Sequence, residues 1–452
     1  MTAPTRTQIF FVSTLYGAAT LAAALDAGCF GPADRRLLLV SNNAPNPETA
    51  PSPDRMPGFA RLRGRFDRVV SWNDAIRPFH PGGWTPRPDD APLWERHLRM
   101  LWGLGEDQRQ DAVELVLESI QVHPALAVAQ LFPDAPIDVY ADGLMSYGPT
   151  RNKLDPLVGS RVRRLLHLDL VPGLRPLLLT EFGVEPEVVP TDAFRSVLRE
   201  LPDDDPAPGE TREGAPALLL GQYLAALGIL TDEEEERLHV RMLRGAAGLG
   251  HRSVVFKPHP VAPARYSRTL EKEAGELGVQ LRVRDEPVLA EVLYERLRPA
   301  LVVGCFSTAL LTAATVYGLP VARTGTDVLL DRLAPYQNSN RVPVTLVDAL
   351  LPDLADAEAV RAWRAPGPGD GEAVAALVRA VGFCMQAQIL PALRPEAERY
   401  LATRLDAGTW RYFKRRRLTS LALPGAVPAP LAFLPRNAAV RRVARRVRRR
   451  LG

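Results

Sequence analysis

The sequence predicts an α/β protein built from two Rossmann-like, doubly wound domains that face a central cleft. Short apolar strands alternate with helical patterns along the first half of the chain, and the alternation restarts in the second half. Between the halves lies an acidic, proline-rich segment, residues 201–210, without apolar periodicity. Such alternation is typical of parallel sheets with crossover helices, and a segment of this composition is typical of a linker.

The elements of the first half follow from aliphatic runs separated by helical periodicity. We expect a buried strand at residues 9–12 and a helix over about 17–27, since polar residues interrupt this stretch and Asp26 lies near its end. The same features argue against a signal peptide. Further strands are expected at 37–40, 69–71 and 137–140, and a long helix around 111–120.

The second half repeats the pattern. Strands are expected at 217–220, 253–256, 279–283 and 301–303, and helices at 232–243, 266–277 and 309–317. The predicted organisation is a first domain at 1–200, a linker at 201–214, a second domain at 215–385, helices at 386–420 that are able to cross back, and a basic amphipathic tail at 421–452.

The composition restricts the class of protein. The 452 residues are 46% hydrophobic and 24% charged, which is typical of a soluble globular chain of two or three domains. Three cysteines without CxxC spacing argue against a disulfide framework and a structural zinc site. No apolar run reaches the roughly 18 residues that a membrane-spanning helix needs. The cysteine usage indicates a reducing compartment, so we expect a cytoplasmic protein.

The charge is unevenly distributed. Residues 436–452 contain eight arginines and no acid, so the rest of the chain has a net charge of −4. Apolar residues recur at helical spacing between these arginines, which predicts an amphipathic cationic helix. Such a helix suits an anionic membrane surface, an anionic polymer or nucleic acid. We favour the inner face of the plasma membrane, contacted by Arg441, Arg442, Arg445 and Arg446, and expect no nucleic acid.

Lys257 and His259 follow an apolar strand. In open α/β sheets, ligands bind at the carboxyl ends of the strands. Pro258 and Pro260 flank His259 and deny it a helical backbone, so its imidazole is expected to face the cleft. Lys257 is one of four lysines against 52 arginines, which makes a lysine here unusual for this chain.

Ser307 and Thr308 follow the strand at 301–303 and begin the next helix. The unpaired N–H groups of a helix start, together with two hydroxyls, form an anion site. The alternative is that Ser307 only caps the helix. With Lys257 and His259 expected at the same sheet edge, phosphate binding is the favoured interpretation.

Asp142 lies just past the strand at 137–140, and Gly143 permits a sharp turn after it. A carboxylate at this edge is placed to deprotonate a hydroxyl in the cleft. The alternative is an Asx-turn that closes the strand. Ser146 and Arg151 belong to a polar loop nearby that suits contact with a sugar or an acid.

Three pairs of residues carry a resemblance to a known family. In order and rough spacing they resemble the acidic-acidic-Gly, HP and Ser/Thr motifs of bacterial sialyltransferases, and the chain is most similar to the polysialyltransferase-like family over roughly residues 8–350. The pairs are Asp142-Gly143, His259-Pro260 and Ser307-Thr308, and Asn42 and Asn43 after the second strand add to the likeness.

The resemblance implies a GT-B fold, with the acceptor side in the first domain and the nucleotide-sugar side in the second. It also implies metal-independent, inverting transfer of a sialic or related nonulosonic acid from a CMP-activated donor to a glycan or lipid-linked acceptor in cell-surface polysaccharide synthesis. No cofactor is expected. Asp142 would act as base and His259 as acid or phosphate ligand, while Lys257, Ser307 and Thr308 would hold the donor phosphate.

The chain departs from the family pattern at one position. Ala141 occupies the first acidic place of the acidic-acidic-Gly motif. If the family's base belongs there, Asp142 or a carboxylate such as Glu118 has to serve. Two alternatives therefore stay open: a CDP-alcohol or other GT-B transferase of teichoic-type polymers, and a catalytically silent partner that binds a nucleotide sugar.

Overall fold

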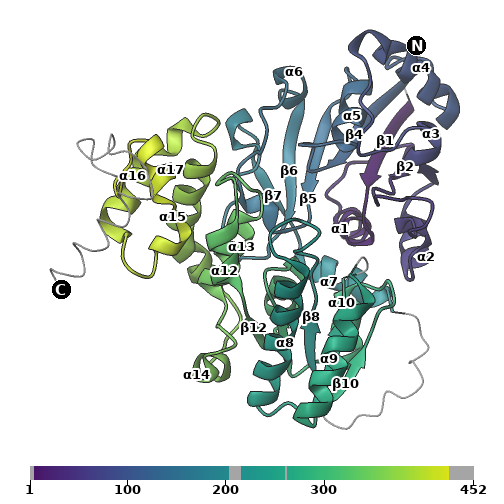
Figure 1. Ribbon diagram of the computed structural model, residues 1–452. Helices are drawn as coiled ribbons and strands as arrows, with labels where there is room; N and C mark the ends of the chain where they lie inside the picture. Colours follow the sequence, from purple (N-terminus) through teal and green to yellow (C-terminus); the bar gives the residue numbers. More distant parts are fainter. Residues whose placement is uncertain (1–4, 203–214, 260–261, 427–452) are drawn as a thin grey trace.

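The computed structural model describes residues 5–202, 215–259 and 262–426. Within these residues the chain forms two parallel sheets with helices on their faces (Figure 1). The predicted linker lies mostly, and the basic part of the predicted tail wholly, outside the described residues.

The first sheet has seven strands in the order β3-β2-β1-β4-β5-β6-β7, all parallel. This order reverses direction between β1 and β4, which is where the crevice of a Rossmann-like sheet opens. The strands are β1 (Thr5–Val12), β2 (Arg35–Val40), β3 (Arg68–Ser71), β4 (Asp111–Glu118), β5 (Ile137–Ala141), β6 (Val162–Leu168) and β7 (Pro186–Val189).

Helices cover both faces of this sheet. Alternate residues of β1 point to opposite faces, so Phe10 and Val12 pack in one buried cluster while Ile9 and Phe11 pack in another. The helices are α1 (Leu15–Asp26), α2 (Phe59–Leu62), α3 (Trp72–Ala75), α4 (Ala91–Trp102), α5 (Ala125–Leu131), α6 (Pro156–Gly159) and α7 (Thr191–Glu200).

The helix expected around residues 111–120 is wrong, because this segment is the central strand β4. Val113, Leu115 and Leu117 are buried together on one face of the sheet, and Glu114 and Glu118 alternate with them. The period is therefore two residues rather than 3.6, and the correction places Glu118 at the end of a strand next to β1.

The second sheet has five parallel strands in the order β10-β9-β8-β11-β12, with its reversal between β8 and β11. Its strands match the predicted positions closely, apart from β12. They are β8 (Ala217–Leu220), β9 (Ser253–Lys257), β10 (Gln280–Val283), β11 (Leu301–Gly304) and β12 (Val321–Arg323).

In the second half of the chain, the helix that follows β11 changes from an α-helix to a π-helix along its length. The segment predicted as one helix at 309–317 is α11 (Thr308–Leu311) continued by a π-helix, η6 (Thr312–Val316). The others are α8 (Asp232–Gly248), α9 (Ala264–Leu277), α10 (Ala290–Leu297), α12 (Thr326–Arg332), α13 (Arg341–Leu350), α14 (Ala357–Arg361), α15 (Pro368–Met385), α16 (Arg394–Arg404) and α17 (Arg415–Ser420).

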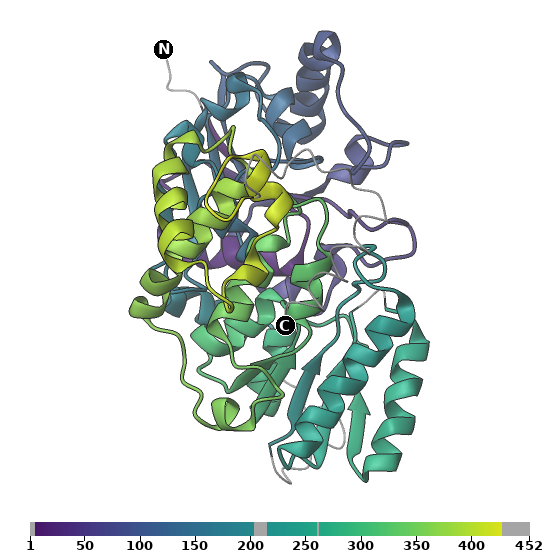
Figure 2. The same ribbon diagram turned by 60° about the vertical axis from the view of Figure 1, so that its left-hand side comes forward.

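Helix α15 packs against the first half of the chain. A Cβ at Gly371 would lie 2.1 Å from the carbonyl oxygen of Pro172, and one at Gly382 would lie 2.6 Å from Leu177. Figure 2 shows α15 to α17, in yellow-green, beside the strands of the first sheet. Two Rossmann-like sheets with a C-terminal helical segment that reaches back to the first are the GT-B fold.

Candidate functional site

A cavity of about 470 Å³ lies between the two sheets. Its walls come from segments that follow strand ends in both halves, which is where parallel sheets bind ligands. The lining includes Ser13, Asn43, Glu118, Ser119, His123, Asp142, Gly143, Ser146 and Arg151 from the first half, and Gln222, Tyr223, His259, Phe306, Ser307, Thr308 and Asn340 from the second.

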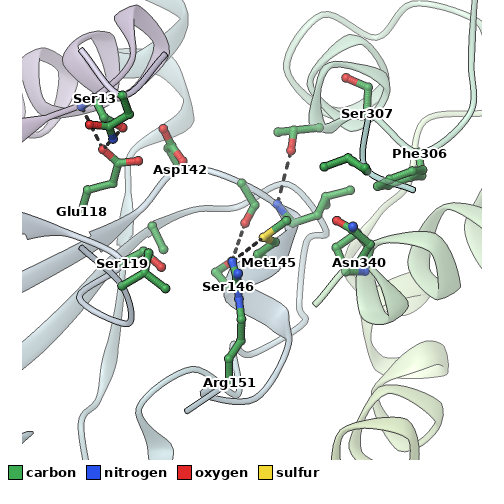
Figure 3. Close-up of a pocket in the computed structure, with 18 of the residues that line it drawn as sticks. Ser13, Glu118, Ser119, Asp142, Met145, Ser146, Arg151, Phe306, Ser307 and Asn340 are labelled. Carbon is green, nitrogen blue, oxygen red and sulfur yellow. Dashed lines mark hydrogen bonds between the residues drawn. The ribbon is translucent and has the colours of Figure 1, made fainter. Parts of the chain in front are cut away.

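Two carboxylates lie on the wall formed by the first half (Figure 3). Glu118 is the last residue of β4, and Asp142 follows the neighbouring strand β5. Glu118 Oε2 accepts hydrogen bonds from the backbone N–H of Ser13, at 2.9 Å, and from its hydroxyl, at 2.7 Å. Ser13 directly follows β1, so the pair sits at the reversal point of the first sheet.

The two carboxylates affect each other's protonation. Burial, and after it the charge of Glu118, raise the pKa of Asp142 to about 7. Burial also raises the pKa of Glu118, while its hydrogen bonds from Ser13 oppose that shift. Since two nearby carboxylates resist ionising together, the pair holds a proton at a pH where an isolated carboxyl is fully ionised.

The opposite wall contains His259, Ser307 and Thr308. The His259 ring lies 4.0 Å from the Tyr223 ring, centroid to centroid, at an interplanar angle of 31°. Burial, and then the charge of Lys257, lower the pKa of His259 to about 4. The imidazole is therefore neutral at pH 7 in the ligand-free cleft, and an arriving anion would favour its protonated form.

The two hydroxyls at the start of α11 have structural partners. Ser307 Oγ accepts a hydrogen bond from the N–H of Ala309 at 3.2 Å, so the residue does cap the helix. Thr308 Oγ1 accepts one from the N–H of Leu144, at 3.4 Å, across the interface. Each hydroxyl keeps its proton for donation to a ligand, so capping and phosphate binding are compatible.

Lys257 does not line the cavity. It is the last residue of β9, is buried, and donates from Nζ to the carbonyl oxygen of Glu286 at 3.4 Å. Burial lowers the pKa of its ammonium group, with nearby acids, Glu291 foremost, opposing that effect. A direct contact between Lys257 and a donor phosphate stays a prediction, and the structure connects Lys257 to the site through the charge that it exerts on His259.

The remaining predicted contact residues differ in their positions. Gly143, Arg151 and Asn43 line the cavity, as does Ser146, whose hydroxyl donates to the carbonyl oxygen of Gly143 at 2.9 Å. Asn42 is not among the lining residues; its side chain donates to the carbonyl oxygens of Pro47 and Ala50 and shapes the loop beside Asn43. The predicted membrane contacts Arg441, Arg442, Arg445 and Arg446 lie outside the described residues.

Several lining residues were not predicted from the sequence. Gln222 and Tyr223 lie just beyond β8, after Gly221, so the rule on strand ends was sufficient to find them. Gln222 accepts a hydrogen bond from the N–H of Phe306 at 3.1 Å and joins the ends of β8 and β11. Asn340, just before α13, gives no comparable sequence signal, because a long connection separates it from β12.

Among residues 5–202, 215–259 and 262–426, no group of three or more His, Cys, Asp or Glu side chains is placed to hold a metal ion. Across the same part of the chain, no helix combines the length and the apolar character that crossing a membrane requires.

The comparisons with known proteins agree with the motifs. A family model described as alpha-2,8-polysialyltransferase matches residues 8–326. No curated protein sequence matches the chain with statistical significance. The chain resembles a solved structure of a UDP-GlcNAc 2-epimerase from Methanocaldococcus jannaschii, with 11% sequence identity and a TM-score of 0.44; the match covers 82% of this chain and 99% of that one. It also resembles the GT-B domain of a sialyltransferase from Photobacterium damselae, with 11% identity and a TM-score of 0.36; this match covers 76% of this chain and 96% of that one.

Proposed function

Because the chain belongs to the alpha-2,8-polysialyltransferase family and is a glycosyltransferase of sialyltransferase type, we propose that its cleft transfers a sialic or related nonulosonic acid from a CMP-activated donor to a glycan hydroxyl. The observation that supports the proposal most is that the carboxylates of Glu118 and Asp142 line the same cavity of about 470 Å³ as His259, Ser307 and Thr308. The family match supports this donor over the teichoic-type alternative.

Asp142 is the proposed base. It lies at the cleft, and its raised pKa of about 7 suits a group that accepts a proton near neutral pH. Ala141, at the position that is acidic in the family motif, ends β5 and is buried. Glu118, on the adjacent strand, supplies a second carboxylate, and its charge raises the proton affinity of Asp142.

The opposite wall receives the leaving group. As the bond between the sugar and CMP breaks, the departing phosphate gains one negative charge. Ser307 and Thr308 would donate from their hydroxyls, and His259 from its imidazole, to this phosphate. A neutral His259 becomes the better donor as the phosphate charge grows, because an adjacent anion raises the pKa of an imidazole. The proposal assigns no metal ion to this step.

The acceptor is proposed to enter over the first half of the chain. A second cavity, of about 520 Å³, shares Val122 and His123 with the main one and includes Lys153. The main cavity contributes Arg151 on the same side. These cations suit a carboxylate-bearing glycan. The proposal further includes a glycan or lipid-linked acceptor at the inner face of the plasma membrane, reached through the C-terminal arginines.

The proposal is tested by ligand binding and by product analysis. We expect calorimetry to show tighter binding of CMP than of CDP or UDP, and incubation with CMP-sialic acid and an oligosialic acceptor to yield an extended product. His259→Ala should lose transfer by at least about a hundredfold while its circular dichroism spectrum stays unchanged.

His251→Ala is the matched control, since His251 is also partly buried, in the second half of the chain, but does not line the cavity. Near-normal turnover in His259→Ala, or equal affinity for CMP and UDP, would contradict the proposal.

A further inference from the structure

Three threonines on the helix that follows β11 face the first half of the chain. Thr308 begins α11, and Thr312 and Thr315 lie in the π-helix η6 that continues it. Their spacing of four and three residues places them along one helix face. We call these three residues the threonine stripe. The intervening residues Leu310, Leu311, Ala313 and Ala314 are completely buried in the apolar core.

Each hydroxyl of the threonine stripe forms a hydrogen bond with a different segment of the first half. Thr308 Oγ1 accepts from the N–H of Leu144 at 3.4 Å. Thr312 Oγ1 lies 3.0 Å from the hydroxyl of Tyr16. Thr315 Oγ1 donates to the carbonyl oxygen of Leu170 at 2.9 Å.

Two of these partners are close in sequence to the acidic pair. Leu144 lies two residues after Asp142. Tyr16 lies three residues after Ser13, which donates both hydrogen bonds to Glu118. The Tyr16 ring is itself fixed, because it packs edge-on against Phe194 at a centroid distance of 5.4 Å. The helix that begins at Ser307 and Thr308, the proposed phosphate ligands, is thus connected to the segments that hold both carboxylates.

We propose that the threonine stripe is a positioning device that sets the distance between the leaving-group residues and the base. Apolar side chains at these positions would hold the two halves together but would let them slide, since apolar contact has no preferred direction. Hydrogen bonds fix both distance and angle. Small displacements of reacting groups reduce rates severely, so hydrogen bonds that hold the two halves at a fixed distance would affect the turnover rate. This inference rests on the proposed function.

The test replaces single hydroxyls. Thr312→Val and Thr315→Val keep the side-chain shape and remove the hydrogen bonds to Tyr16 and Leu170. Thr312→Val also removes the bond that Thr312 Oγ1 donates to the carbonyl oxygen of Thr308 at 3.2 Å. We expect kcat to fall about tenfold or more while the Kd for CMP stays within twofold, because the proposed phosphate ligands His259, Ser307 and Thr308 all belong to the second half. Thr312→Ser and Thr315→Ser should restore most of kcat. Tyr16→Phe, which removes the partner hydroxyl, should reproduce the effect of Thr312→Val.

Thr345→Val is the matched control. Thr345 is completely buried on α13, and its hydroxyl has no hydrogen-bond partner among the described residues. The proposal is overturned if kcat of Thr312→Val and Thr315→Val stays within twofold of that of Thr345→Val. It is also overturned if the CMP affinity falls by the same factor as kcat, since the threonines would then shape the donor site itself.

Hydrogen exchange, measured without any substrate, tests this inference separately from the proposed function. The N–H of Leu144 is bonded to the threonine stripe, so hydrogen exchange in the peptide spanning residues 142–148 should accelerate in Thr312→Val and Thr315→Val but not in Thr345→Val. If the wild-type protein neither binds CMP nor transfers sialic acid, the proposed function fails. The exchange result still decides whether the threonine stripe is coupled to the segment that holds Asp142. Unchanged exchange in both variants overturns the coupling.

Discussion

At the residue scale, the acidic pair determines how the cleft depends on pH. Asp142 and Glu118 come from adjacent strands, and the charge of one raises the pKa of the other. A carboxyl whose pKa is higher in the folded than in the unfolded state stabilises the fold at low pH, and this contribution is lost as the pH rises through the folded value. For Asp142 the loss falls between its usual pKa and about 7.

Glu118→Gln distinguishes the roles of the two carboxylates. Removing the charge of Glu118 should lower the pKa of Asp142, so the acidic limb of the profile of kcat/KM against pH should shift to lower pH, with turnover within about tenfold of wild type near pH 8. Asp142→Asn should abolish turnover at every pH.

Asp169→Asn serves as the control for these variants, because burial also raises the pKa of Asp169 but it does not line the cavity. An inactive Glu118→Gln together with an active Asp142→Asn would assign the base to Glu118 instead.

How far the sequence could predict this site depends on how near each residue is to a strand end. Asp142, His259, Ser307 and Thr308 follow strands whose apolar character is evident, so the rule on ligand binding at sheet edges placed them correctly in one cavity. Lys257, the last residue of β9, is buried and does not line the cavity, so its contact with a donor phosphate stays a prediction. Alternation along a strand decides orientation, and a shift of one residue reverses it.

At the element scale, β4 shows why helices and strands are confused in short apolar segments. Val113, Leu115 and Leu117 recur at every second residue, with Glu114, Val116 and Glu118 between and after them, which is a strand pattern, but a segment of this length also satisfies a helical one. The tertiary neighbours β1 and β5 settle the question by pairing with it on both sides. Neither neighbour is adjacent to it in sequence, so this information is not local.

The contact of α15 with the first half predicts opposite effects for two glycine substitutions in one helix. Gly371→Ala would place a methyl group 2.1 Å from the carbonyl oxygen of Pro172, so we expect a loss of about 1–3 kcal/mol in the free energy of unfolding. Gly369→Ala has open space around its Cβ and should gain a few tenths to about 1 kcal/mol from helix propensity.

Urea unfolding, followed by circular dichroism at one temperature, measures both variants. Equal midpoints for the two variants would mean that α15 does not press on Pro172 as closely as the structure describes.

At the scale of the whole molecule, the charge distribution bears on where the enzyme works. The body of the chain is mildly acidic, and eight arginines follow in residues 436–452. Near an anionic surface each cation contributes about 1 kcal/mol of attraction, which screening by salt weakens. An acidic body gives no comparable attraction, so binding to a membrane would depend on the tail.

Removing residues 427–452 tests this dependence. We expect the full chain to sediment with vesicles containing phosphatidylglycerol at low salt and to stay in solution with neutral vesicles, whereas the shortened chain should stay in solution with both. Turnover on a soluble acceptor should be the same for both chains. Equal sedimentation of the two chains would remove the tail from the proposal.

β4 was expected as a helix, and β6, β7 and β12 were not predicted, but the two sheets themselves could be, because their other strands have a local apolar signal. The position of α15 could not, because its amphipathic pattern does not state which half of the chain supplies its partner surface. Gly371 and Gly382 allow the close approach of α15 to Pro172 and Leu177. The sequence alone does not show that these glycines face those two residues.

The close approach of α15 to Pro172 restricts which second halves can be joined to the first half of this chain. A chimaera that joins a foreign second half to residues 5–202 inherits the foreign α15 as well. Unless that helix has glycine where Gly371 stands, its first added carbon meets the backbone of the host. If the second half binds the donor, as proposed, a new donor specificity can be introduced this way only together with a helix surface that fits Pro172.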